Sequence, residues 1–316
     1  MARTVAVTGG SGRLGRAVVA ALIEDGWTVV NFDRVPSPDS RARFIRTDLT
    51  DYGQVVEALS GIDEVHRGVN AVVHLAAIPG ATFAPNVATF DNNLVSTFHV
   101  FQAAKLFKIN NLVWASSETL LGYPFNNPPA YVPLDDDVPP TPEVVYALAK
   151  DLEEEMARQY CRWNPDQKMI GLRFSNVMDP AQYADFPSFE EDPVSRKWNL
   201  WSYIDVRDGA QAVIRALAYD KSGFDNFVIA NADTVMSRPS TELMAEFFPE
   251  VEFRGTVEGT ESLINREGPP RPRLGTPTLV ARWQLRLGVE RPWAGAGGAA
   301  GVASRSNTSE RQGHHE

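Results

Sequence analysis

Short apolar segments alternate with amphipathic segments along the first half of the chain. The apolar segments have the length and composition of buried strands, and they lie at 5–7, 28–32, 43–46, 71–75 and 111–115. Apolar residues at helical spacing lie between these strands, at 16–25, 54–59 and 90–107. This alternation predicts an α/β fold with a doubly wound parallel sheet, because right-handed crossover helices cover both faces of such a sheet.

The second half of the chain is less regular and opens with an acidic, proline-rich loop at about 124–142. The pattern then predicts a helix at 143–163, a strand at 169–174, a helix near 206–219 and a strand at 226–230. We expect residues 1–175 to form a first domain. Residues 176–266 are expected to form a small C-terminal lobe for a substrate, interleaved with the first domain.

Composition narrows the classes of partner. The 316 residues include 30 Lys and Arg against 40 Asp and Glu, which gives a net charge of −10 and argues against nucleic-acid binding. No apolar run approaches the ~18 residues of a membrane span, and the first residues enter a strand pattern without a signal peptide. The single cysteine, Cys161, fits a reducing compartment. We therefore expect a cytoplasmic protein with a small-molecule substrate and neither a membrane nor a nucleic-acid partner.

A glycine-rich turn joins the first predicted strand to the first predicted helix. Gly9, Gly12 and Gly15 have G-x-x-G-x-x-G spacing, which permits a tight turn and a close approach of backbone to pyrophosphate. Free N–H groups at the start of the helix can then bind phosphate. The alternative is a glycine-rich turn without a ligand. The strand–turn–helix context favours a dinucleotide.

An acid at the end of the second strand indicates which dinucleotide is preferred. A carboxylate at Asp33 would accept hydrogen bonds from the adenosine ribose and repel a 2′-phosphate, which favours NAD. Arg34 could pair with a 2′-phosphate, so NADP stays possible. Asp48 and Leu49 follow the third strand and are placed to border the adenine, although Asp48 could equally cap a helix.

A series of further motifs follows in a fixed order. The segments are Thr8–Gly15, His74-Leu75-Ala76-Ala77, Asn93 with Ser96-Thr97, Ser116-Ser117 with Gly122, Tyr146-Ala147-Leu148-Ala149-Lys150, Leu172–Val177 and Trp201–Asp208. Together they resemble the extended short-chain dehydrogenase/reductases, the NAD-dependent epimerase/dehydratase family. The resemblance covers about residues 3–265. It departs from the family pattern at Leu121, where a Tyr is usual. It implies a Rossmann-type fold and a homodimer paired through two helices.

The candidate catalytic residues are Ser117, Tyr146, Lys150 and Asn93. Tyr146 and Lys150 are four residues apart on a helix and share one face, so the ammonium should lower the phenol pKa towards neutrality. Tyr146 could then exchange a proton while hydride moves to or from the nicotinamide. Ser117 would orient the reacting oxygen. Asn93 could support the site or be purely structural.

The expected cofactor-binding residues lie in the glycine-rich turn, at the strand ends and on the helix that carries Tyr146 and Lys150. They are Gly9, Gly12, Arg13, Leu14, Gly15, Asp33, Arg34, Asp48, Leu49, Leu75, Ala76, Ala77, Tyr146 and Lys150. No His/Cys cluster has metal-ligand spacing, and His74 is expected to pack at a strand end. Asp151, Glu153, Glu154 and Glu155 are expected to form a solvated helix face.

Three functions stay open. The leading hypothesis is an NAD(P)-dependent oxidoreductase or epimerase acting on a carbinol or carbonyl of a sugar or sugar acid. A nucleotide-sugar epimerase or dehydratase is the enzymatic alternative, and a non-catalytic NAD(P) sensor is the other. Residues 178–200 form a short segment whose only bases are Arg196 and Lys197. This predicts a small substrate without a diphosphate, as in the uronate dehydrogenases.

From about Glu267 the composition changes to Pro, Arg, Gly and Ala, and periodicity disappears. Members of the resembled family commonly end with a helix and a G-W/Y-x-P-x-x-S-W stretch. One synonymous-codon choice for 267–281, read one nucleotide later, encodes such an ending. We predict that 267–316 is an out-of-frame translation and is disordered, because it has little apolar surface to offset its ordering entropy. Resequencing the gene tests its origin.

Overall fold

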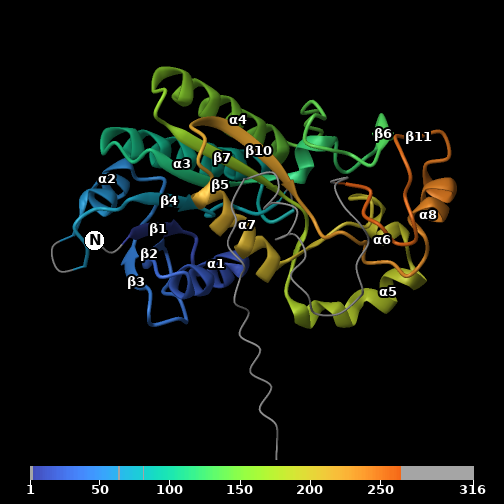
Figure 1. The fold of residues 1–316 in the computed structure, drawn as a ribbon, viewed down its shortest axis with the longest axis horizontal. Helices are drawn as coiled ribbons and strands as arrows, with labels where there is room; N and C mark the ends of the chain where they lie inside the picture. The colour runs from blue at the N-terminus through green and yellow to red at the C-terminus, as the bar shows by residue number, and fades with distance from the viewer. Residues whose placement is uncertain (1–2, 63–64, 81, 265–316) are drawn as a thin grey trace, which may run out of the picture.

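The computed structural model describes residues 3–62, 65–80 and 82–264 (Figure 1). The predicted out-of-frame tail, 267–316, lies outside the described residues. Seven parallel strands form the central sheet, in the order β3 (Arg43–Arg46), β2 (Thr28–Asp33), β1 (Thr4–Thr8), β4 (Ala71–His74), β5 (Asn111–Ser117), β7 (Lys168–Phe174) and β10 (Gly223–Ile229). The predicted doubly wound, Rossmann-type sheet is confirmed. Its strand order reverses between β1 and β4, where such folds open a ligand crevice at the carboxyl ends of the strands.

Helices cover both faces of the sheet (Figure 1). One layer contains α1 (Arg13–Glu24) and α7 (Val206–Ala218), and the other contains α2 (Tyr52–Ser60), α3 (Asn86–Leu106) and α4 (Val145–Trp163). Successive side chains of β1 pack against opposite helix layers, because the side chains of a strand point alternately to the two faces of its sheet. Val5 and Val7 join the core under α1 and α7, whereas Ala6 joins the core under α2, α3 and α4.

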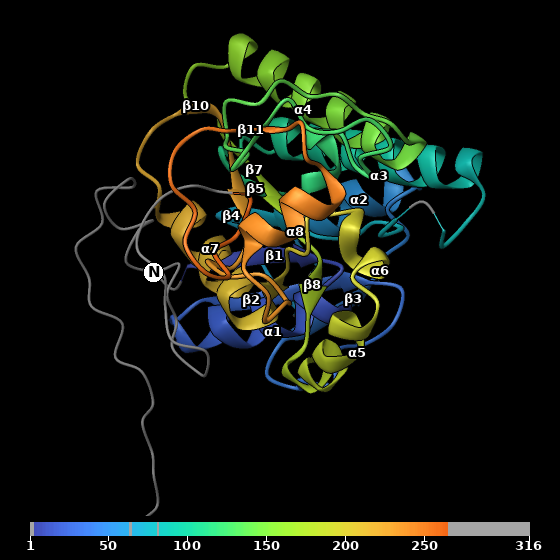
Figure 2. The same ribbon diagram turned by 90° about the vertical axis from the view of Figure 1, so that its right-hand side faces the viewer.

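A smaller lobe lies at one end of the sheet (Figures 1 and 2). It has its own apolar core, which includes Trp201, Met236 and Leu263. Its elements are short: η1 (Glu118–Leu121), β6 (Tyr131–Val132), β8 (Val177–Met178), η2 (Pro180–Asp185), α5 (Phe186–Glu191), α6 (Val194–Lys197), β9 (Ile204–Asp205), α8 (Ser240–Phe247) and β11 (Glu252–Phe253). Two parallel strand pairs, β6–β11 and β8–β9, hold it together.

The chain passes between the two lobes more than once. Leu121 to Leu134, which precede residue 175, contribute to the core of the small lobe. The helix and strand that the sequence placed in the small lobe, α7 and β10, belong instead to the large one. β10 pairs with β7 at the edge of the central sheet, and α7 packs beside α1. The apolar residues of α7 predicted a helix correctly, but they did not indicate which core the helix would cover.

Within the part of the chain that the structure describes, no helix combines the length and the apolarity that a membrane crossing requires.

Candidate active site

The glycine-rich turn follows β1 and leads into α1. Gly9 has a φ of +70°, and a Cβ placed there would lie 2.6 Å from the backbone nitrogen of Ala76. A Cβ on Gly15 would lie 2.0 Å from the carbonyl oxygen of Gly9. Gly12 precedes the first residue of α1, and its N–H donates to the same carbonyl at 3.0 Å. Gly9 and Gly15 therefore require glycine, and the turn leaves the start of α1 accessible to a phosphate.

A cavity of about 330 Å³ opens between this turn and the carboxyl ends of β1, β2 and β4. Of the predicted cofactor residues, those that line it are Gly9, Gly12, Asp33, Arg34, Leu49, Leu75, Ala76 and Ala77. Its glycine cradle, apolar walls and terminal carboxylate fit the adenosine and pyrophosphate half of NAD. When bound, NAD would supply the hydride acceptor or donor.

The other predicted cofactor residues lie outside this lining. The Arg13 guanidinium donates to the carbonyl of Val177 at 3.0 Å and pairs with Asp179 at 3.5 Å, so it links α1 to the small lobe. Leu14 and Gly15 pack at the helix–sheet contact. Asp48 binds Arg34 beside the cavity, and Tyr146 and Lys150 lie on α4, towards the centre of the sheet.

Sequence reasoning missed seven residues of the lining: Ser11, Phe32, Val35, Thr47, Ile78, Asn92 and Ser96. Most of them lie next to a predicted residue at a strand end or in the glycine turn. The rule that ligands bind outside the carboxyl ends of the strands could have found them. Asn92 and Ser96 lie on α3; Ser96 belongs to the motif that begins at Asn93, and Asn92 is the neighbour of Asn93 in sequence.

Asp33 closes the cavity at the end of β2. Its carboxylate accepts hydrogen bonds from the N–H groups of Ser11 at 3.0 Å and Arg34 at 2.7 Å. The neighbouring guanidinium of Arg34 is paired with Asp48 at 3.0 Å. A hydrogen bond from the Thr50 hydroxyl, together with Arg34, lowers the pKa of Asp48 to about 2. Asp48 therefore stays ionised and compensates the charge of Arg34, which reinforces the preference of Asp33 for a ribose without a 2′-phosphate.

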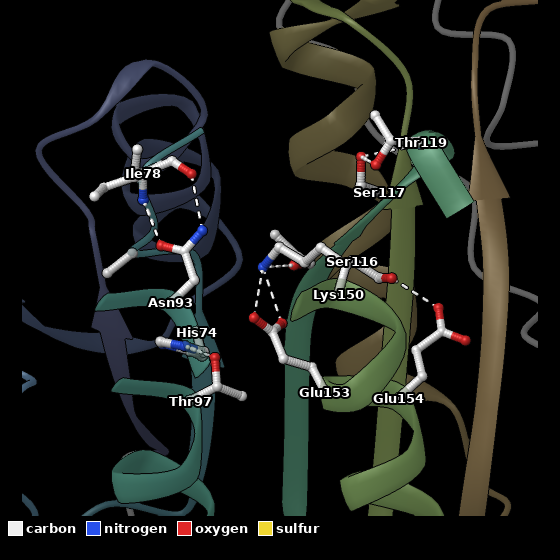
Figure 3. Close-up of polar contacts among 12 residues, drawn as sticks. His74, Ile78, Asn93, Thr97, Ser116, Ser117, Thr119, Lys150, Glu153 and Glu154 are labelled. Carbon is white, nitrogen blue, oxygen red and sulfur yellow. Dashed lines mark hydrogen bonds and ion pairs between the residues drawn. The ribbon is translucent and has the colours of Figure 1, made fainter. Parts of the chain in front are cut away.

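Asn93 acts on the wall of the cavity. Its amide accepts from the N–H of Ile78 at 2.7 Å and donates to the carbonyl of the same residue at 2.9 Å (Figure 3). The side chain is buried, and it holds the connection between β4 and α3. Of the two predicted roles, the structural one is supported by these contacts.

Ser117, Tyr146 and Lys150 come together where β5 meets the first turns of α4. Ser117 is the last residue of β5, and a hydrogen bond from its hydroxyl to Tyr146 favours the phenolate. The Lys150 ammonium lies 6.0 Å from the centre of the Tyr146 ring. It donates to the carbonyl oxygen of Ala115 at 2.9 Å, so β5 positions both the serine and the lysine.

The electrostatics of the pair differ from the sequence prediction. Burial raises the pKa of Tyr146 above its ordinary value, and Lys150 opposes this effect without overcoming it. The expectation of a phenol pKa near neutrality is therefore wrong for the protein without its cofactor. One reason that the pKa stays high is Glu153. Its carboxylate forms an ion pair with the Lys150 ammonium at 2.9 Å and counteracts the positive charge.

Two of the four acids expected on a solvated face are buried. Glu153 and Glu154 are 0% exposed, whereas Glu155 is exposed. Glu154 forms a bidentate ion pair with Arg173 of β7, with both N···O distances 2.9 Å, and also accepts from Ser116 at 2.7 Å. The expectation for these two residues is wrong. Their spacing of three and four residues after Lys150 places them on the inner face of α4, a signal that the sequence did contain.

Glu118 follows Ser117 and is also buried. Its carboxyl oxygen accepts from the Asn199 amide at 3.4 Å. Burial raises the pKa of Glu118 to about 7, although Ser175 and Asn199 work in the opposite direction. A group that titrates near neutrality therefore lies beside the candidate catalytic serine.

His74 is buried at the end of β4, between Thr8 at 2.7 Å and Thr97 at 3.0 Å (Figure 3). Burial, with a contribution from Lys150, lowers the pKa of His74 to about 3, so the imidazole is neutral. Among the residues described, no group of His, Cys, Asp or Glu side chains could hold a metal ion.

Comparison with known proteins decides the family. The sequence model of the NAD dependent epimerase/dehydratase family matches residues 5–230. The chain belongs to this family. The predicted family is thereby confirmed, and so is NAD as the cofactor. The match includes the glycine turn, Asp33, Ser117, Tyr146 and Lys150.

Individual members of the NAD-dependent epimerase/dehydratase family are distant. UDP-glucose 4-epimerase 2 of Arabidopsis thaliana is 27% identical over 223 residues, which are 65% of this chain and 59% of that protein. A putative UDP-glucose 4-epimerase of Methanocaldococcus jannaschii is 26% identical over 273 residues, 79% of this chain and 83% of that protein. The chain thus spans less than two thirds of the plant relative.

A solved short-chain dehydrogenase/reductase superfamily protein from Agrobacterium tumefaciens, with bound NAD, has a similar fold. It superposes with a TM-score of 0.64 at 24% identity, over 92% of this chain and 93% of that chain.

Proposed function

We propose that the protein transfers hydride between NAD and a carbinol or carbonyl carbon of a sugar or sugar acid. In oxidation, the substrate C–H would leave as hydride and its O–H proton would pass to Tyr146. Ser117 would orient the reacting oxygen, and Lys150 would supply positive charge near the phenol. The observation that carries this proposal is the meeting of these three side chains beside a glycine cradle. A non-catalytic sensor would need the cradle but not the three side chains.

The small lobe supports a compact substrate. Arg196 and Lys197 are the only bases between residues 178 and 200. The Arg196 guanidinium is buried and donates to the carbonyl of Ser202 at 2.7 Å. The Lys197 ammonium lies 4.7 Å from the centre of the Phe248 ring. Because both cations already have partners within the lobe, neither is free to bind a diphosphate without giving up these contacts. We therefore favour a free sugar or sugar acid.

A nucleotide-sugar 4-epimerase is the second candidate, because the relatives of this chain include UDP-glucose 4-epimerases. One experiment separates the two. The protein is incubated with NAD in the presence of a free sugar, a sugar acid or a UDP-sugar, each in a separate reaction. Net oxidation releases NADH, which is followed by its absorbance. Epimerisation gives no net NADH, and its product is identified by chromatography. Turnover restricted to UDP-sugars would replace our proposal with the alternative.

A homodimer is proposed for the same protein. α3 and α4 pack side by side and expose apolar side chains, including Val95 and Phe98 on α3 and Leu148 and Leu152 on α4. An exposed apolar surface of this kind is typical of an interface. Light scattering should give twice the chain mass, and Leu148→Asp with Leu152→Asp should give a monomer. A monomeric wild-type protein would contradict this proposal.

A further inference from the structure

The buried carboxylate of Glu153 has no role in the proposed reaction, yet it contacts the lysine on which that reaction depends. Both oxygens of Glu153 accept from the Lys150 ammonium, at 3.2 and 2.9 Å. The third acceptor is the carbonyl of Ala115 at 2.9 Å. The Glu153 carboxylate and the Ala115 carbonyl thus engage at least two of the three N–H donors of the ammonium. Held in this way, the ammonium lies 6.0 Å from the centre of the Tyr146 ring.

A second set of contacts fixes Glu153 from the opposite side. The Thr97 hydroxyl donates to the Glu153 carboxylate, and Thr97 in turn contacts the imidazole of His74. The other imidazole nitrogen contacts the Thr8 hydroxyl, which accepts from the N–H of Ala76 at 3.3 Å. When the proton of neutral His74 is on Nε2, each group in this series donates one hydrogen bond to the next, from Ala76 through Thr8, His74 and Thr97 to Glu153. This chain of hydrogen bonds thus begins at Ala76, which follows β4 and lines the cavity, and ends on Glu153.

We infer that Glu153 is a positioning residue: it holds the Lys150 ammonium away from Tyr146 and cancels its charge, so that Tyr146 becomes a base only at higher pH. Burial raises the pKa of Glu153, whereas Lys150 and the Thr97 hydroxyl favour the carboxylate form, which pairs with the ammonium at 2.9 Å. Its negative charge raises the pKa of Tyr146, in opposition to Lys150. This inference rests on the proposed role of Tyr146, but its first test does not.

Other titratable or charged groups face this cluster, and they must be the same in the wild-type protein and in any Glu153 variant with which it is compared. They are His74 from β4, Glu118 from η1, Arg173 from β7 and Glu154 from α4. Glu154 is neutralised by Arg173, and His74 is uncharged. Glu118 also raises the pKa of Tyr146. Since a substitution at Glu153 leaves all four in place, a change in Tyr146 is attributable to Glu153.

The test is Glu153→Gln, which keeps the shape and removes the charge. Tyrosinate absorbance is titrated in the protein without cofactor, and the signal of the matching Tyr146→Phe protein is subtracted to isolate Tyr146. We expect the ionisation midpoint of Tyr146 to fall by about 1 pH unit, the scale of a nearby charge. Glu155→Gln, on the exposed side of the same helix, should leave the midpoint unchanged. An unchanged midpoint in Glu153→Gln would overturn the inference.

Glu153→Asp provides a second variant in case the first does not fold. It keeps the charge but withdraws the carboxylate from the ammonium, so a smaller downward shift is expected. An upward shift or no shift in this variant would also count against the inference. With a substrate in hand, the acidic limb of the kcat profile should move in the same direction. A shift of the absorbance midpoint in a protein without NAD-dependent turnover would refute the proposed function but leave the inference intact.

Discussion

Glu118→Gln gives a prediction whose size follows from the structure. In the folded protein the pKa of Glu118 is about 7, against an ordinary value of 4.5, because the side chain is buried. The folded chain therefore holds an extra proton between these two pH values. The stability that Glu118 contributes is complete below pH 4.5 and is lost as the pH rises to about 7. The difference between the two pKa values corresponds to about 3 kcal/mol, most of which lies between about pH 5 and pH 8.

The assay is urea unfolding followed by tryptophan fluorescence at several pH values. The quantity of interest is the unfolding free energy of the wild-type protein minus that of Glu118→Gln, because other titrations cancel in the difference. We expect this difference to fall by about 2 to 3 kcal/mol from about pH 5 to pH 8. Glu250→Gln makes the same acid-to-amide change at an exposed position and serves as the control. A pH-independent difference for Glu118→Gln would refute the assignment of a buried, protonated carboxyl group.

Three further predictions concern the cofactor and the core. Asp33→Ala should narrow the preference for NAD over NADP, because Arg34 then meets a 2′-phosphate without the repulsion of Asp33; calorimetry with both cofactors checks this, and an unchanged ratio would show that Asp33 plays no part. Glu154→Gln should lower the unfolding free energy by about 3 kcal/mol, because it leaves the Arg173 guanidinium buried and uncompensated; a loss below 1 kcal/mol would contradict this. Asn93→Ala removes two hydrogen bonds to Ile78, so NAD affinity should fall by about tenfold with little change in kcat; a loss of kcat alone would instead indicate a catalytic Asn93.

The parts of the fold that depend on local pattern were predictable from the sequence. The predicted strand at 43–46 and β3 have the same limits, and the glycine spacing located the turn at Gly9 and Gly12. α7 and β10 were correctly predicted as a helix and a strand but assigned to the wrong lobe. Their partners, α1 and β7, are distant in sequence, and periodicity within a segment carries no information on which core it joins.

The site was predictable to the same extent. Motif spacing predicted Ser117, Tyr146 and Lys150 as one catalytic set, but the pKa of Tyr146 depends on burial and on Glu153. Charged residues are usually solvated, so a run of acids was assigned to the surface. The counter-charges that allow Glu153 and Glu154 to be buried come from Lys150 and Arg173, and only tertiary structure reveals the second pairing.

The central claim is that Tyr146 exchanges the proton in an NAD-dependent hydride transfer. The most direct measurement is the initial rate of NADH formation with the best free sugar or sugar acid, for the wild-type protein and for Tyr146→Phe. The variant keeps the ring and lacks the hydroxyl, so its rate should fall by about 10²-fold or more while NAD still binds. Equal rates in the two proteins would contradict the account.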